Sequence, residues 1–297
     1  MKFKLKDFLS RKFNQIKVVC LDRYCNDDVK ITKAKYFCKN KIALNLENPQ
    51  EFMEKIQWLK LYYYKEAYGQ YVDKFDVRSY VEKKIGSEHL NQMIGVYDSV
   101  DEIDFKSLPT QYVIKGTHGS GYNIIVKDSS LIKEVEVKRK LELFLKSNYY
   151  FKNREIVYKN VKPRILIEKF ILNCEETCLI DYKFYCFHGQ PKYILVKKNE
   201  NGKEKQCFYD LNWKEIYSSE NHNNSFESEI EKPANFEKMI ELATVLSKDF
   251  IFIRVDLYLV VDKIVFGELT FFPTGGNTRL KINHLNKEMG SLIKLPF

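Results

Sequence analysis

Residues 252–272, FIRVDLYLVVDKIVFGELTFF, decide how the fold is interpreted. The stretch is rich in β-branched and aromatic residues and is predicted to form two strands joined by a turn near Asp262 and Lys263. A hairpin pairs such strands, so Asp256 and Glu268 are expected to converge at one end of a sheet. Two neighbouring carboxylates can hold a magnesium ion. Acidic residues usually lie at the surface, so two ordinary exposed carboxylates are the alternative.

Arg254 strengthens the interpretation of this hairpin as a site. It lies two residues before Asp256, and strand alternation puts both side chains on one face. A guanidinium there could bind phosphate oxygens beside a metal ion. A surface salt bridge between the two is the alternative that the same spacing allows.

A glycine-containing loop is predicted within residues 108–128, LPTQYVIKGTHGSGYNIIVKD, between two β-rich runs. Lys115 ends the first run, and the backbone N–H groups of the GTHGSG segment are little obstructed for an anionic phosphate. The loop lacks the Gly-Lys-Ser/Thr ending of a P-loop, so a plain hairpin turn is the alternative.

Two further strands carry candidate binding residues. In ILIEKFI, residues 165–171, the backbone of Glu168 and Lys169 could pair with an adenine edge while neighbouring apolar side chains cover the ring. An edge strand without a ligand is the alternative. In DYKFY, Lys183 could reach a phosphate above the sheet, although such a lysine is often simply solvated.

The composition is that of a folded globular protein. The chain has 297 residues, of which 44% are hydrophobic and 30% charged, and a net charge of +9. The seven cysteines form no CxxC pair, so neither a disulfide framework nor a zinc site is expected. No run is long and apolar enough for a membrane span, and a cytoplasmic protein is expected. The charge excess fits phosphate or carboxylate substrates as well as an anionic polymer.

The chain is expected to have three parts: a helical N-terminal region over residues 1–70, a first subdomain over 71–170 and a second over 171–297. The opening 17 residues place apolar side chains on one helical face among lysines and arginines. This helix is expected to pack on the protein's own core, and contact with the inner face of the membrane is the alternative. Residues 199–226 are expected to form a polar, irregular loop.

The ordered motifs DK, VIKGTHGSG, LIEKF, RVD and GELTF, between residues 73 and 271, resemble those of the ATP-grasp superfamily. The resemblance is to its TupA-like branch, which acts in teichuronopeptide biosynthesis, and it covers about residues 70 to 280. It implies an α+β fold, the ATP-grasp fold, with the nucleotide between two α+β subdomains.

The resemblance also implies roles for single residues. Lys115 and Lys183 would contact the phosphates of ATP, with Arg254 near the transferred phosphate, and Asp256 and Glu268 would hold Mg2+. Asp73 and Lys74 mark the first motif without an assigned role. Many ATP-grasp ligases have Asn two positions after the metal-binding Glu, where this chain has Thr270. The remaining nucleotide contacts would come from the loop residues His118, Gly119, Ser120 and Gly121, from Glu168, Lys169, Phe170 and Ile171 at the adenine, and from Glu175 at the ribose, with Glu176 as its neighbouring competitor.

The implied reaction joins a carboxylate to an amine. ATP would phosphorylate the carboxylate to an acylphosphate, which the amine then attacks. The family points to modification of a cell-surface polysaccharide such as a capsule, with a uronic acid as the carboxylate and an amino acid or amino alcohol as the amine. A glycosyltransferase is one alternative, and a non-enzymatic module that binds nucleic acid or an anionic glycan is another. No nucleic-acid partner is expected.

Overall fold

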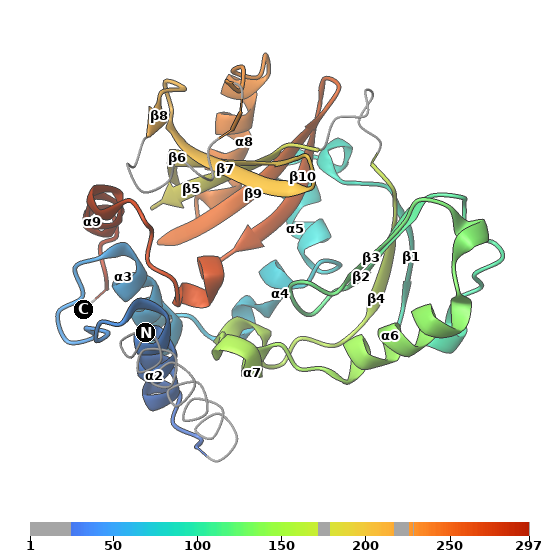
Figure 1. Ribbon diagram of the computed structural model, residues 1–297, viewed down its shortest axis with the longest axis horizontal. Helices are drawn as coiled ribbons and strands as arrows, with labels where there is room; N and C mark the ends of the chain where they lie inside the picture. Colours follow the sequence, from blue (N-terminus) through green and yellow to red (C-terminus); the bar gives the residue numbers. More distant parts are fainter. Residues whose placement is uncertain (1–24, 172–178, 217–225, 228, 297) are drawn as a thin grey trace, which may run out of the picture. The chain divides into compact units, whose positions relative to one another are not determined.

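The computed structural model describes residues 25–171, 179–216, 226–227 and 229–296. The chain divides into two compact units. Unit 1 comprises Met1–Lys65, Tyr150–Ile156 and Phe272–Phe297, and unit 2 comprises Glu66–Tyr149 and Val157–Phe271 (Figure 1). The division at residues 70 and 170 that the sequence suggests stays a prediction. The amphipathic segment of the first 17 residues lies outside the described residues.

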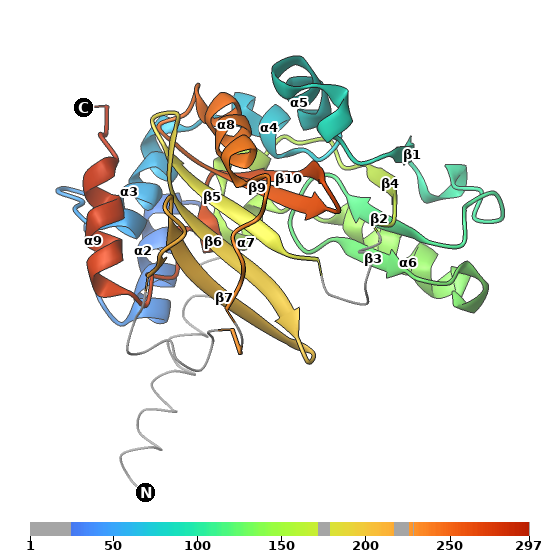
Figure 2. The same cartoon turned by 90° about the horizontal axis from the view of Figure 1, so that it is seen from above.

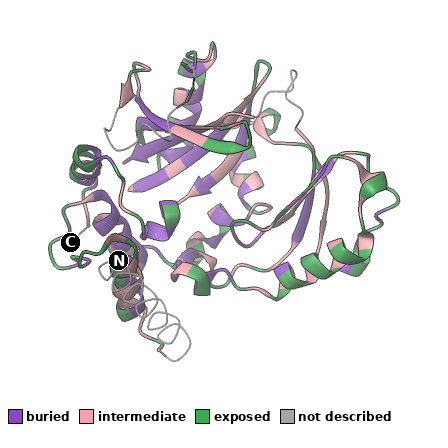
Figure 3. Cartoon of the chain, viewed as in Figure 1, coloured by how far each residue is buried: buried purple, intermediate pink, exposed green. Residues whose placement is uncertain are grey.

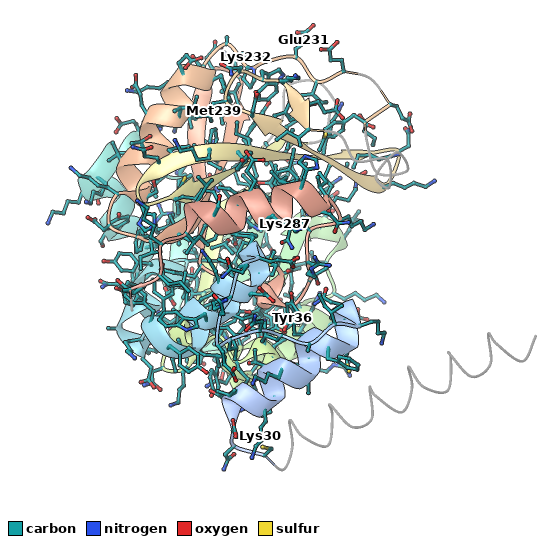
Figure 4. The ribbon with its side chains drawn as sticks, turned by 90° about the vertical axis from the view of Figure 1, so that its left-hand side faces the viewer. Lys30, Tyr36, Glu231, Lys232, Met239 and Lys287 are labelled. Atoms are coloured by element: carbon teal, nitrogen blue, oxygen red, sulfur yellow. The ribbon has the colours of Figure 1, made fainter. Side chains whose placement is uncertain are left out.

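Unit 1 is helical where it is described. Asp27 caps its first described helix by accepting a hydrogen bond from the Lys30 backbone N–H at 3.0 Å. Tyr36 of that helix, labelled in Figure 4, is completely buried. The elements of unit 1 are α2 (Asp28–Asn40), α3 (Phe52–Trp58), the π-helix η1 (Leu59–Tyr63), α7 (Tyr150–Asn153), the 3-10 turn η7 (Pro273–Gly276) and α9 (Asn283–Leu292).

Unit 2 contains a four-stranded sheet in the order β1-β4-β2-β3, with every neighbouring pair antiparallel. Its core includes the buried Tyr112, Ile114 and Ile167 of the sheet and Leu141 of helix α6. Figure 3 colours the buried parts of the chain purple. The strand that carries Glu168, β4, lies between two others and is therefore not an edge strand. The elements are β1 (Met93–Tyr97), β2 (Tyr112–Gly116), β3 (Asn123–Val126), β4 (Ile165–Lys169) and α6 (Glu134–Lys146).

A six-stranded sheet forms the other part of unit 2, in the order β10-β9-β5-β6-β7-β8. Helix α8 packs on β5, β6 and β9 (Figure 2) and buries Phe236, Met239 and Leu246. The two strands expected within residues 252–272 are present as β9 and β10. The elements are β5 (Asp181–Phe187), β6 (Gln190–Glu200), β7 (Lys203–Asp210), β8 (Glu215–Ile216), α8 (Phe236–Ser247), β9 (Phe252–Val260) and β10 (Lys263–Thr270).

Part of the segment 199–226 is a hairpin, so the expectation of an irregular loop there was wrong. Strands β6 and β7 pair as far as Glu200 and Lys203, around a turn in which Asn201 and Gly202 both have positive φ (52° and 77°). An Asn-Gly pair favours that backbone, and it is a strong short-range signal for a hairpin. The high polarity of the segment concealed this signal.

Short helical segments precede β1 or lie between elements of the four-stranded part of unit 2. Helix α5 ends at Gly86, whose φ of 100° few other residues adopt. Among the described residues, no helix is long and apolar enough to cross a membrane. The segments are η2 (Glu66–Tyr68), α4 (Gly69–Val72), α5 (Val77–Ile85), η3 (Ser87–His89), η4 (Val100–Glu102), η5 (Ser129–Leu131) and, at the boundary of the units, η6 (Ile156–Tyr158).

Candidate active site

Three neighbouring strands of the six-stranded sheet bring a group of charged side chains together. Asp256 of β9 is the cross-strand partner of Glu268 on β10 and of Lys183 on β5. Arg254 lies two residues before Asp256 and opposite Thr270. Directly opposed residues of an antiparallel pair have their Cβ atoms about 5 Å apart, so the sheet register alone makes these side chains neighbours.

Ion pairs join the members of this group, which we call the carboxylate cluster (Lys183, Arg254, Asp256, Glu268 and Thr270). Arg254 binds Asp256 in bidentate fashion, with Nε 2.6 Å from Oδ1 and Nη2 2.7 Å from Oδ2. Its Nη2 also donates to Glu268 Oε1 and to Thr270 Oγ1, both at 3.0 Å. Lys183 Nζ lies 2.6 Å from Asp256 Oδ2. Asp256 is therefore shared by two cations.

The electrostatics of the cluster favour the charged forms of Asp256 and Lys183. Burial raises the pKa of Asp256, but the charges of Arg254 and Lys183 outweigh burial and hold it below its usual value. Burial likewise disfavours the ammonium of Lys183, yet Asp256 raises the pKa of this lysine above its usual value. The cluster thus presents Asp256 as a buried carboxylate whose ionised form is favoured by two neighbouring cations.

The donor set fits a magnesium ion. Mg2+ is usually held by one or two carboxylates together with waters and substrate phosphates. Asp256 is 1% exposed and Glu268 has a side chain 40% exposed, so the pair offers one fixed ligand and one open to solvent. Thr270 donates its hydroxyl to Glu268 Oε1 at 2.9 Å and thereby orients that carboxylate. No group of three or more His, Cys, Asp or Glu residues suited to a metal occurs among the residues described.

The second part of the candidate site is the glycine loop, residues 117–122 between β2 and β3. Gly119 is buried, and a Cβ there would lie 2.7 Å from the Tyr122 ring and 2.8 Å from the Tyr149 ring, so the packing requires glycine. Ser120 and Gly121 are exposed, and Gly121 has a φ of 84°. The tip of the loop is therefore open to a ligand while its base is tightly packed.

His118 belongs to this loop but turns its ring inward. The imidazole is 2% exposed, and its Nε2 lies 2.8 Å from the carbonyl oxygen of Phe144 on α6. Burial lowers the pKa of this histidine, so its neutral form is favoured. The ring serves the packing of the loop, and a contact between the backbone of His118 and a nucleotide stays a prediction.

Glu168 organises the cations beside the loop. Its carboxylate accepts from Lys115 Nζ at 2.7 Å and from Arg78 Nη1 at 2.9 Å, with Arg78 contributed by α5. Nothing in the sequence near Arg78 singled it out for this contact. Lys115 is thus held at the end of β2 by a carboxylate on the neighbouring strand.

Asp73 and Lys74, which had no assigned role, anchor the glycine loop. The Lys74 backbone N–H donates to Thr117 O at 3.1 Å, and its Nζ donates to Gly119 O. Burial lowers the pKa of Lys74, whereas nearby Glu268 opposes this shift, so Lys74 is within electrostatic reach of the carboxylate cluster. Asp73, fully buried, accepts at Oδ1 from the backbone N–H groups of Phe75 (2.8 Å) and Asp76 (2.9 Å) and so fixes the segment.

The predicted adenine segment lies at the end of β4. The Lys169 backbone N–H donates to Gln92 O, and its carbonyl accepts from Asn91 Nδ2, both at 2.9 Å. A carbonyl has two lone pairs, so that of Lys169 retains capacity for one further donor. Phe170 and Ile171 follow the strand and are partly buried. Glu175 and its competitor Glu176 lie outside the described residues.

The model of the family described as TupA-like ATP-grasp matches residues 54–294. The chain belongs to the TupA-like ATP-grasp family. The match places it in the ATP-grasp ligase superfamily and confirms the expected family and fold. No curated protein matches the sequence.

Solved structures of ATP-grasp ligases are similar to this TupA-like protein at a distance. D-alanine–D-alanine ligase from Bacillus anthracis, complexed with ATP, is 16% identical with a TM-score of 0.44, and the match covers 76% of this chain and 64% of that one. The Helicobacter pylori ligase is 14% identical with a TM-score of 0.42, over 83% and 70% of the two chains. Phosphoribosylamine–glycine ligase from Thermotoga maritima is 15% identical with a TM-score of 0.42, over 75% and 53%.

Proposed function

We propose that this TupA-like ATP-grasp protein is an ATP- and Mg2+-dependent carboxylate–amine ligase. The observation that carries the proposal is the convergence of Asp256, Glu268, Lys183 and Arg254 on three adjacent strands. Two carboxylates and two fixed cations on one face suit a metal-bound polyphosphate. Family membership supports the same reaction class.

In the proposed reaction, an oxygen of the substrate carboxylate attacks the γ-phosphorus of ATP, and the bond from that phosphorus to the β-γ bridging oxygen breaks. ADP leaves, and an acylphosphate forms. The amine then attacks the acyl carbon, inorganic phosphate leaves with the electron pair of the C–O bond, and the amine loses a proton to give an amide. No nucleophile of the protein takes part.

Different residues of the chain would have different roles in this reaction. Asp256 and Glu268 would hold Mg2+, which when bound would neutralise phosphate charge. Arg254 and Lys183 would stabilise the charge on the transferred phosphoryl group. Lys115 and the backbone of Gly119, Ser120 and Gly121 would bind phosphate oxygens.

The nucleoside would bind beside β4. Lys169, Phe170 and Ile171 are the candidates at the adenine, together with the backbone of Glu168, and Glu175 is the candidate at the ribose. The carboxyl group of Glu168 is already engaged by Lys115 and Arg78, so its side chain acts through these cations.

For the substrates, we propose a uronic acid as the carboxylate and an amino acid or amino alcohol as the amine, in the modification of a cell-surface polysaccharide. Membership of the TupA-like family supports this choice. We place the reaction in the cytoplasm, where ATP is available, with access to the inner face of the membrane.

The test is Mg2+-dependent ADP release in the presence of uronic acids and a pool of amines. The wild-type protein is expected to release ADP, and Glu268→Gln to release it about 100-fold more slowly, because the open metal ligand loses its charge. Glu204→Gln is the matched control, because it removes a carboxylate from an exposed ion pair with Lys197 on the same sheet. Consumption of a sugar nucleotide without ADP would instead indicate a glycosyltransferase, and salt-sensitive glycan binding without ATP turnover would indicate a binding module.

A further inference from the structure

A third carboxylate, Asp181, contacts the carboxylate cluster and has no role in the function proposed above. It is the first residue of β5, two positions before Lys183 and on the same face of the strand. Lys183 Nζ lies 2.8 Å from Asp181 Oδ2 and 2.6 Å from Asp256 Oδ2. The ammonium of Lys183 is therefore shared between two carboxylates, one on each side.

The two carboxylates differ in their surroundings. The side chain of Asp256 is 1% exposed and also holds Arg254, whereas that of Asp181 is 25% exposed. A metal ion that binds Asp256 must take an oxygen that a cation now uses. Metal binding at Asp256 thus competes with the ion pairs of Arg254 and Lys183.

Arg254 and Lys183 differ in the hydrogen-bond partners that they keep when Asp256 binds a metal ion. Arg254 retains Glu268 and Thr270 as partners when an oxygen of Asp256 turns to a metal. For Lys183, whose side chain is only 9% exposed, Asp181 is the remaining carboxylate within hydrogen-bond distance among the described residues. Before a phosphate reaches it, a buried ammonium without a partner is costly, so the loss of Asp181 would tie Lys183 more strongly to Asp256 and oppose entry of the metal.

We propose that Asp181 is a positioning residue that keeps Lys183 paired while Asp256 serves the Mg2+–nucleotide complex. This inference rests on the proposed function, because it assumes that Asp256 binds the metal. In this role Asp181 pairs with Lys183 when Mg2+ and nucleotide are bound, and it does not contact the substrate. Lys183 contacts both carboxylates at once, so it stays paired with Asp181 when Asp256 binds the metal.

The test measures binding of a non-hydrolysable ATP analogue by calorimetry at a series of Mg2+ concentrations, so it does not depend on turnover. Asp181→Asn keeps the shape of the side chain and removes its charge. We expect the Mg2+ concentration for half-maximal analogue binding to rise about tenfold, within the usual range of coupling between two ligands. Asp181→Glu is expected to restore most of the loss, and Glu204→Gln, the exposed control on the same sheet, to change nothing.

The outcomes separate this inference from the proposed function. If the wild-type protein binds no analogue at any Mg2+ concentration, the proposed function fails and takes the inference with it. If the wild type binds but Asp181→Asn needs no more Mg2+ than wild type, only the role of Asp181 is overturned. Thermal melting of each variant shows whether the protein is folded. If Asp181→Asn does not fold, Asp181→Glu decides: a Mg2+ requirement within threefold of wild type supports a role of the charge, and loss of Mg2+-dependent binding overturns it.

Discussion

Asp256 and Glu168 are two buried carboxylates that bind the same kinds of cation but differ in how far those cations are exposed to solvent. Each holds one arginine and one lysine: Asp256 binds Arg254 and Lys183, and Glu168 binds Arg78 and Lys115. The partners of Asp256 are 12% and 9% exposed, whereas those of Glu168 are 17% and 29% exposed. The first group is therefore better shielded from water than the second.

The two groups also differ in how the chain builds them. Arg254 is two residues from Asp256 on one strand, and Lys183 is its direct cross-strand neighbour. Glu168 instead depends on a helix residue 90 positions away. A group fixed by sheet register is set as soon as its strands pair, whereas the group around Glu168 also needs α5 to dock. The shielding of the Asp256 group and its construction from the strands of one sheet suit a site whose charged side chains are held close together.

The largest effect is expected from Asp256→Asn. This change leaves two poorly exposed cations with an uncharged partner, and removing one member of a buried ion pair costs about 3 to 5 kcal/mol of unfolding free energy. Urea denaturation at pH 7 measures the loss. A loss below about 1 kcal/mol would mean that water reaches Arg254 and Lys183 more easily than their exposure indicates.

Acid should reduce the difference between wild type and Asp256→Asn. Because the folded-state pKa of Asp256 lies below its usual value near 3.8, its charge stabilises the fold at every pH above that value. This stabilisation is lost as the pH falls through the lower, folded-state pKa. The difference in unfolding free energy should therefore stay constant from pH 7 to 5 and narrow below pH 4, and a difference that already narrows between pH 7 and 5 would contradict the assignment.

Glu168→Gln should have a smaller effect on stability. Its cations can turn to water, so we expect a loss of about 1.5 to 3 kcal/mol, the usual range for hydrogen bonds to charged groups. The same urea experiment tests this value. If Glu168→Gln costs as much as Asp256→Asn, exposure of the partners does not explain the difference between the two groups.

The smallest effect is expected from Thr270→Val, which keeps the shape of the side chain and removes its hydroxyl. Arg254 and Glu268 each lose one hydrogen bond but keep each other, so about 1 kcal/mol of stability should be lost. The rate of ADP release should also fall, although the protein stays folded, because Glu268 loses the hydroxyl that orients its carboxylate. Equal activity in wild type and Thr270→Val would show that Glu268 needs no such support.

The parts of the structure that depend on local sequence pattern could be predicted from the sequence. The hairpin of β9 and β10 follows from β-branched runs around a turn, and strand alternation put Arg254 and Asp256 on one face. Long-range contacts could not be derived in this way. Nothing local indicates that the His118 ring turns toward α6, that Arg78 reaches Glu168, or that Lys74 holds the carbonyl of Gly119. The β6 and β7 hairpin was within reach, because Asn201-Gly202 is a local signal.

The register of β9 and β10 determines which face of the sheet carries the side chains of the site. The pairing of the two strands shifts register between Phe266 and Glu268. A slip of β9 by one residue would turn Arg254 and Asp256 to the opposite face together. A molecule with that slipped pairing would therefore lose the guanidinium and the carboxylate from the site at the same time.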